Sequence, residues 1–178
     1  MQFTYRPASM DDVAELNGLI PESVRALSPG YYTPAQIERA IQHIFGVDSQ
    51  LIADGTYYVA EADGRLVGCG GWSRRRTLFG GDQMKGSADD RLDPARDPAR
   101  IRAYFVRPEW ARRGIGRRII EMCESAARAD GFQAMELVAT LPGEPLYAAL
   151  GYRVTRYFEI PMADDEGLPA AHMVKELE

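Results

Sequence analysis

The stretch from Ala103 to Arg118 constrains the fold of this chain more than any other. It passes from a β-prone run through Pro108 into a short loop rich in arginine and glycine, and then into a long amphipathic segment. Glycines allow sharp turns and close approach of the backbone to a ligand, and the start of a helix presents unpaired N–H groups at its positive end. The pattern therefore predicts a strand, an anion-binding loop and a helix, with phosphate as the natural ligand.

The two segments that flank this loop have different hydrophobic periods. Residues 101–106 alternate with a period of two, in which Ile101, Ala103 and Phe105 share one face, so we expect the central strand of a sheet there. Pro108 cannot donate to a ladder, and the strand must end or splay. From residue 115 to Gly131 the period is helical. We expect a polar outer face on this helix, made of Arg117, Arg118, Glu121, Glu124 and Arg128.

The first half of the chain predicts two helices and a hairpin. Ser9 with Asp12, and Thr33-Pro34 with Gln36, are typical helix starts. Two β-rich runs, 56–62 and 66–73, are joined by Asp63-Gly64, which favours a tight antiparallel turn.

The remaining segments complete the predicted elements. Residues 74–99 contain few side chains that could be buried, so we expect a long surface loop of the kind that often forms a lid. Further strands are expected over 135–139, 152–160 and 170–177, with a short helix over 144–150 and a turn around Asp165 to Gly167.

These elements predict an α/β or α+β sandwich with a mixed sheet, because the hairpin is antiparallel and the strand–helix–strand unit from 101 to 139 is parallel. The chain has 178 residues, of which 46% are hydrophobic and 26% charged. Such a length and composition predict a single domain over residues 1–178.

Composition also argues against several functional classes. The formal net charge of −5 gives no overall attraction to nucleic acid or to an anionic membrane, and no apolar run approaches the roughly 20 residues of a membrane span. Two cysteines and two histidines form no disulfide framework or metal-ligand spacing, so we expect no metal. We expect a soluble protein of the reducing cytoplasm.

The order of elements and the residues together resemble the GNAT (GCN5-related N-acetyltransferase) superfamily over nearly the whole chain. The resemblance rests on the Arg-Pro-Ala opening, on Val-Arg-Pro-Glu-Trp before Arg-Arg-Gly-Ile-Gly, and on Leu-Tyr-Ala-Ala-Leu-Gly-Tyr at 146–152. The acetyl-CoA loop of the family has the form Gln/Arg-x-x-Gly-x-Gly/Ala. Here Ala111 stands at the Gln/Arg position, and the arginines are displaced to Arg112 and Arg113.

The resemblance implies a GNAT-type mixed, mostly antiparallel sheet with a splayed parallel strand pair and helices on both faces. It also implies direct transfer of acetyl from acetyl-CoA to a primary amine within a ternary complex. Backbone N–H groups from Arg112 to Arg117 would hold the pyrophosphate, and the N–H of Phe105 or Val106 would polarise the thioester carbonyl. The implied cofactor-binding residues are Phe105, Val106, Arg112, Arg113, Gly114, Ile115, Gly116 and Arg117. Plain sheet pairing is the alternative for the strand, and a solvated helix face is the alternative for Arg117.

Tyr147 corresponds to the tyrosine with which family members often protonate or hydrogen-bond the departing thiolate. A core ring with a satisfied hydroxyl is the alternative, and we expect Tyr152 to be structural. For the general base the candidates are Glu61 and Glu136, both in predicted strands, where a solvent-facing carboxylate without a catalytic role is the alternative. Relatives that rely on a water chain need no such residue.

The acceptor is a small-molecule or peptide amine whose identity the sequence does not define. Tyr31, Tyr32 and Trp72 are candidate walls of its site, with ordinary aromatic packing as the alternative. His172 is expected at the surface or on an edge strand. A homodimer is expected only because twofold dimers are common.

Two other functions remain as alternatives. One is a non-catalytic acyl-CoA-binding or regulatory module of the same fold, for which the lack of an obvious base is the support. The other, a Rossmann-type nucleotide-binding protein, is disfavoured because the glycine pattern is incomplete and the loop does not follow a first strand.

Overall fold

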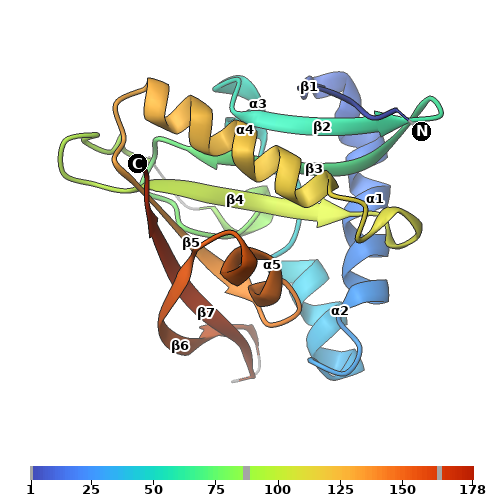
Figure 1. Ribbon diagram of the computed structural model, residues 1–178. Helices are drawn as coiled ribbons and strands as arrows, with labels where there is room; N and C mark the ends of the chain where they lie inside the picture. Colours follow the sequence, from blue (N-terminus) through green and yellow to red (C-terminus); the bar gives the residue numbers. More distant parts are fainter. Residues whose placement is uncertain (1, 86–88, 164–165) are drawn as a thin grey trace.

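The computed structural model describes residues 2–85, 89–163 and 166–178, and in these the strands form one sheet of order β1-β2-β3-β4-β5-β7-β6 (Figure 1). Neighbouring strands are antiparallel except for β4 and β5, which are parallel. The strands are β1 (Thr4–Pro7), β2 (Tyr57–Ala62), β3 (Arg65–Ser73), β4 (Ala99–Val106), β5 (Ala134–Thr140), β6 (Arg153–Pro161) and β7 (Gly167–Glu176). The mixed, mostly antiparallel sheet is confirmed.

Helices cover both faces of the sheet, as predicted. Helix α4 crosses β2, β3 and β4 on the face that also carries α5, while α1 and α2 pack on the other (Figure 1). The α-helices are α1 (Val13–Leu27), α2 (Pro34–His43), α3 (Ser49–Ala53), α4 (Ile115–Ala129) and α5 (Glu144–Ala149), and the short 3₁₀ turns are η1 (Met10–Asp12), η2 (Asp82–Met84) and η3 (Pro108–Trp110). Two apolar clusters, one on each face, form the core.

The turn and helix-capping residues identified in the sequence have the expected conformations. Asp63 and Gly64 both have positive φ, 51° and 76°, as the tight β2–β3 turn requires. Thr33 Oγ1 accepts a hydrogen bond from the Gln36 amide at 3.1 Å, which caps the start of α2. Helix α1 continues through Pro21 to Leu27. Part of the predicted turn around Asp165 lies outside the described residues.

A β-bulge at Ala103 breaks the regular alternation expected for β4. Cys69 pairs with Phe105 and Gly71 with Arg102, so β4 contains one extra residue, and Ala103 adopts a φ of 56°. The Tyr57 hydroxyl donates to the Ala103 carbonyl at 2.8 Å and holds the bulge in place. Beyond the bulge the two faces of the strand are exchanged, so the side chains of residues 104 and 106 lie on the α4 face.

The predicted surface loop at 74–99 is tied down over its described part. Asp48, which is fully buried before α3, accepts hydrogen bonds from Arg102 at 2.9 Å and from Lys85. Arg75 forms a bidentate pair with Asp54 at the end of α3. Residues 86–88 of this loop lie outside the described residues. The sequence does not predict α3, and the ion pairs show that this short helix anchors the loop.

Replacing Asp48 by alanine is expected to lower the free energy of unfolding by about 3–5 kcal/mol, because the guanidinium of Arg102 would stay buried without its counter-ion. Denaturant unfolding measures the change. Glu38→Ala is the matched control, since it removes the carboxylate of an exposed pair with Arg25 and should change stability little. Equal effects in the two variants would contradict this role of Asp48.

The helical period places Glu124 on the polar face of α4, but the structure buries this carboxylate. Only 8% of the residue is exposed, and it accepts hydrogen bonds from the Tyr152 hydroxyl and from Lys175, each at 2.9 Å. Glu124 therefore connects α4 to the segment after α5 and to β7.

Candidate functional site

The parallel strands β4 and β5 separate soon after they meet. Their paired residues are Ala99 with Met135 and Arg100 with Glu136, whereas β4 continues to Val106 and β5 to Thr140. The second half of β4 is thus paired with β3 on one side and with no described strand on the other, and we call this gap in the strand pairing the opening. This is the splayed pair that the sequence predicts.

The direction of the backbone N–H groups distinguishes the two candidate donors on β4. Arg107 donates its amide to the Val67 carbonyl of β3 at 2.9 Å. Because N–H groups alternate in direction along a strand, that of Phe105 also points toward β3 and that of Val106 points toward the opening. Val106 is therefore the available donor, and the N–H of Phe105 belongs to the sheet.

The loop that follows β4 ends in an open helix start. Arg112 and Gly114 have positive φ values of 65° and 84°, and α4 begins at Ile115. The first hydrogen bond of the helix joins the Arg118 amide to the Gly114 carbonyl at 3.0 Å, so the amides of Ile115, Gly116 and Arg117 point out of the helix end. Such a cluster of donors suits a phosphate.

Close packing fixes this helix start beside α5. A Cβ atom on Gly116 would meet Leu146 Cδ2 at 3.0 Å, and one on Gly68 would meet Ile115 Cγ2 at 2.6 Å. The absence of side chains at these glycines thus allows α4 to approach β3 and α5. As a result, Tyr147 lies on the same face of the sheet as the loop.

The loop arginines are exposed to solvent. The guanidinium of Arg113 lies 5.0 Å from the centre of the Trp110 ring, and Arg112 and Arg117 are also exposed. Arg118 forms a long ion pair of 3.9 Å with Glu121. The displaced arginines therefore place positive charge around the helix start, where Ala111 has none.

Tyr147 lies in a row of three tyrosine rings that pack edge to face, with interplanar angles of 76° and 72°. Its ring centre is 6.2 Å from that of Tyr104 and 5.9 Å from that of Tyr152. The Tyr104 hydroxyl contacts Cys123 Sγ at 3.1 Å and that of Tyr152 donates to Glu124, whereas the hydroxyl of Tyr147 has no hydrogen-bond partner among the described residues. Burial raises the pKa of the Tyr147 phenol well above its usual range, so it keeps its proton at neutral pH.

The two candidate bases lie in different surroundings. Glu61 is on β2 beside the edge strand β1, two strands away from β4, and Arg6 holds its carboxylate at 2.7 Å. Glu136 lies at the closed end of the β4–β5 opening, paired with Arg100 and 2.7 Å from His172 Nε2. Only Glu136 is near the separated strands.

His172 is on β7 between β5 and β6, so the expectation of an edge strand is wrong. Its Nε2 faces Glu136 and its Nδ1 lies 2.5 Å from Thr155 Oγ1. Burial, with smaller contributions from Arg156 and Arg100, lowers the pKa of the imidazole, which favours the neutral form. The neutral ring can then donate to Glu136 and accept from Thr155.

The three aromatic candidates for an acceptor wall are not together. Trp72 is 2% exposed and packs edge-on against Phe132 in the core, which is the packing role that the sequence leaves open. Tyr31 is 52% exposed. The hydroxyl of Tyr32 donates to the Pro169 carbonyl at 2.5 Å and accepts from the Leu141 amide at 2.9 Å, which ties the α1–α2 connection to the end of β5.

Sequence reasoning missed Ser23 of α1. The residue is 3% exposed, and its Oγ accepts a hydrogen bond of 3.3 Å from the Val106 amide, the same N–H that points into the opening. The sequence signal is a serine at a position where the helical period requires an apolar residue.

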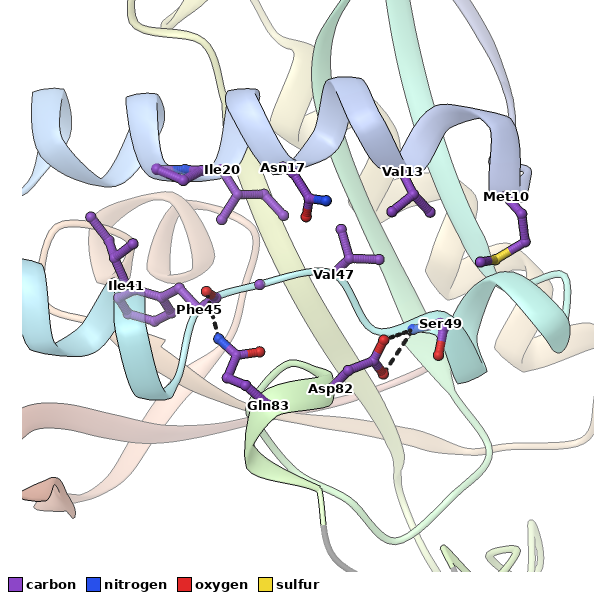
Figure 2. A pocket seen from close by; sticks show the side chains of 12 residues that line it. Met10, Val13, Asn17, Ile20, Ile41, Phe45, Val47, Ser49, Asp82 and Gln83 are labelled. Atoms are coloured by element: carbon purple, nitrogen blue, oxygen red, sulfur yellow. Dashed lines mark hydrogen bonds between the residues drawn. The ribbon is translucent and has the colours of Figure 1, made fainter.

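A separate groove of about 540 Å³ lies between α1, the α2–α3 connection and η2. Figure 2 shows Val13, Asn17 and Ile20 pointing from α1 toward this connection. Its polar groups are largely paired, since the Asp82 carboxylate accepts from the Ser49 amide and the Gln83 side chain donates to the Phe45 carbonyl. None of the predicted site residues lines this groove.

Comparison with known proteins agrees with the geometry. The model of the acetyltransferase (GNAT) family matches residues 21–152. No match was found among curated protein sequences. No helix in the described part of the chain is long and apolar enough to cross a membrane.

Several solved structures share the fold over nearly the whole chain. A GCN5-related N-acetyltransferase from Rhodopseudomonas palustris is 22% identical, with a TM-score of 0.73 over 99% of this chain and 97% of that one. PaiA N-acetyltransferase from Thermoplasma acidophilum, in complex with coenzyme A, is 15% identical, with a TM-score of 0.66 over 99% of both chains. YncA from Salmonella typhimurium, with its cofactor acetyl-CoA, is 17% identical, with a TM-score of 0.65 over 100% of this chain and 95% of that one.

Proposed function

Because the chain belongs to the acetyltransferase (GNAT) family, we propose that it is an acetyl-CoA-dependent N-acetyltransferase that acts on a primary amine by direct attack in a ternary complex. The observation that supports this most strongly is the opening between β4 and β5, which leads along the free edge of β4 to the open start of α4. The proposal takes residues 1–178 as one such domain.

The residues present fit acetyl-CoA. The amides of Ile115, Gly116 and Arg117 point out of the start of α4 as donors for the pyrophosphate. Those of residues 112–114 are proposed to join them, with Arg112, Arg113 and Arg117 as nearby cations. Val106 has its N–H on the edge of β4 that no described strand pairs, where Ser23 Oγ accepts it at 3.3 Å, and this N–H is suited to a carbonyl of the pantetheine–thioester arm. When bound, acetyl-CoA supplies the acetyl group as an activated thioester.

Tyr147 is proposed to donate its phenolic proton to the thiolate that departs when the amide bond forms. Its hydroxyl has no partner among the described residues, and its raised pKa keeps the proton available at neutral pH. The same free hydroxyl argues against a module that only binds acyl-CoA.

Glu136 is proposed to accept the amine proton, directly or through water, while Arg100 and His172 hold its carboxylate in place. Both carboxylates are paired with an arginine, so position decides between them. Glu61 is on β2, two strands from β4, and this gives less support for Glu61 as the base.

Glu136→Gln is therefore expected to lower kcat about a hundredfold, because the amide cannot accept the proton. Glu61→Gln is the matched control and should keep kcat close to that of the wild type. Steady-state rates over a range of pH, together with unfolding curves for both variants, make the comparison. A loss of turnover in Glu61→Gln and none in Glu136→Gln would reverse the assignment.

The acceptor is proposed to be a small-molecule or peptide amine that approaches from the α1–α2 side, where Tyr32 contacts the end of β5 and Tyr31 is exposed. A cytoplasmic location is in keeping with two buried cysteines that form no disulfide. A homodimer is proposed only because twofold dimers are frequent.

The test is release of free thiol from acetyl-CoA with a panel of amines, amino acids, peptides and aminoglycosides. We expect thiol release that depends on the amine and formation of the matching amide. Binding of CoA by calorimetry without turnover on any amine would favour the non-catalytic module, and failure to bind CoA would contradict both.

A further inference from the structure

Ser23 is a polar residue in the apolar stripe of α1. The buried residues of this helix are Leu16, Leu19, Ile20, Ser23 and Val24. Only 3% of Ser23 is exposed. Burying a hydroxyl is unfavourable unless it is well hydrogen-bonded, so its presence in this stripe calls for a physical reason.

The hydrogen bonding of Ser23 is incomplete. Its Oγ accepts from the Val106 amide at 3.3 Å, which is long for an N–H···O bond. Within the described part of the chain its O–H has no acceptor. A buried donor therefore remains unused beside the opening between β4 and β5.

Ion pairs hold Ser23 in this position. Arg107, the residue after Val106, pairs with Glu22, the residue before Ser23. Arg107 Nε also donates to the Leu66 carbonyl at 2.7 Å, which attaches the same side chain to β3. The register between α1 and the end of β4 is therefore set by neighbours of Ser23, and Ser23 itself is not needed for it.

We propose that Ser23 is a binding residue for the pantetheine–thioester arm of acetyl-CoA. The inference rests on the proposed function. In the free protein the serine oxygen accepts the Val106 N–H. When the arm pairs with the edge of β4, one of its carbonyl oxygens takes this N–H, and the Ser23 O–H donates to the same oxygen, which has two lone pairs.

A purely structural role makes a different prediction. If Ser23 only provides a small side chain where α1 packs on β4, alanine would serve equally well. If its oxygen merely competes with the arm for the Val106 N–H, removing it would tighten binding. The proposed hydrogen bond predicts weaker binding instead.

The experiment measures the dissociation constants of CoA and acetyl-CoA by calorimetry for the wild type and Ser23→Ala. We expect about fivefold to tenfold weaker binding of both ligands, the size of one lost hydrogen bond. Ser28→Ala is the matched control, because Ser28 is buried at the end of the same helix and forms no hydrogen bond with Val106 in the described part of the chain, so this variant should bind as the wild type does.

Ser23→Thr keeps the hydroxyl and is expected to stay within about threefold of the wild type, and thermal unfolding checks that each variant is folded. Unchanged or tighter binding in Ser23→Ala would overturn the proposal, as would equal losses in the alanine and threonine variants. Failure of the wild type itself to bind CoA would instead contradict the proposed function.

Discussion

Gly114→Asp is expected to weaken CoA binding at least about a hundredfold while the protein stays folded. The residue precedes α4 with a φ of 84°, and apart from its chain neighbours no described residue has a heavy atom within 4 Å of the position its Cβ would take. A carboxylate there would face the phosphates that the helix start is proposed to bind, and two like charges a few ångströms apart at a protein surface repel by about 4 kcal/mol. Calorimetry with CoA measures the loss.

Gly114→Asn is the control, because asparagine has nearly the same shape, tolerates positive φ about as well as aspartate and carries no charge. Gly114→Asn should weaken CoA binding only by the effect of the added bulk, without the charge repulsion. The gap between the two variants should narrow as salt is added, since salt screens exposed charges. Equal affinities at low salt would show that no anion binds at the start of α4.

Tyr147→Phe is expected to lower kcat about a hundredfold and to leave the KM for acetyl-CoA within about twofold of the wild-type value. The substitution removes only the hydroxyl and keeps the edge-to-face contacts of the ring with Tyr104 and Tyr152. Initial rates at saturating amine measure both constants.

Tyr152→Phe is the matched control, since its hydroxyl lies in the same row of rings but is bound to Glu124. It should lower the free energy of unfolding, because Glu124 loses a buried donor, and leave kcat nearly unchanged. If Tyr147→Phe turned over at the wild-type rate, Tyr147 would have no part in protonating the thiolate.

Local sequence signals predict most of the elements around this site. The glycine and arginine loop, the helix after it and the Asp63-Gly64 hairpin all form as expected, because each depends on short-range geometry such as positive φ, capping and hydrophobic period. β4 ends at Val106, just before Pro108, as expected, but β4 and β5 already separate after Arg100 and Glu136, so the proline does not mark where the pair opens.

The bulge at Ala103 could not be predicted from the alternation of residues. One additional residue in β4 reverses the alternation over the rest of the strand. As a result, the N–H of Val106, and not that of Phe105, points to the opening. Small glycines on β3 contribute to this arrangement, because a Cβ on Gly70 would meet the Tyr104 ring at 2.8 Å. Such a requirement comes from the neighbouring strand and is absent from the local pattern.

Polar residues with distant partners account for the other differences. Glu124 and His172 look like surface residues in the sequence, and both are partly or largely buried because Lys175 and Glu136 lie opposite them across the fold. Ser23 likewise has its hydrogen-bond partner, Val106, 83 positions further along the chain. Periodicity places side chains on a face, but only the tertiary structure supplies their partners.

The most direct test of the central claim is a titration of the ¹⁵N-labelled protein with acetyl-CoA, followed by amide chemical shifts. We predict that the largest changes fall on Val106 and on residues 114–117, the free edge of β4 and the start of α4. Binding whose shifts were confined to the groove between α1 and η2, or the absence of any shift, would contradict the account.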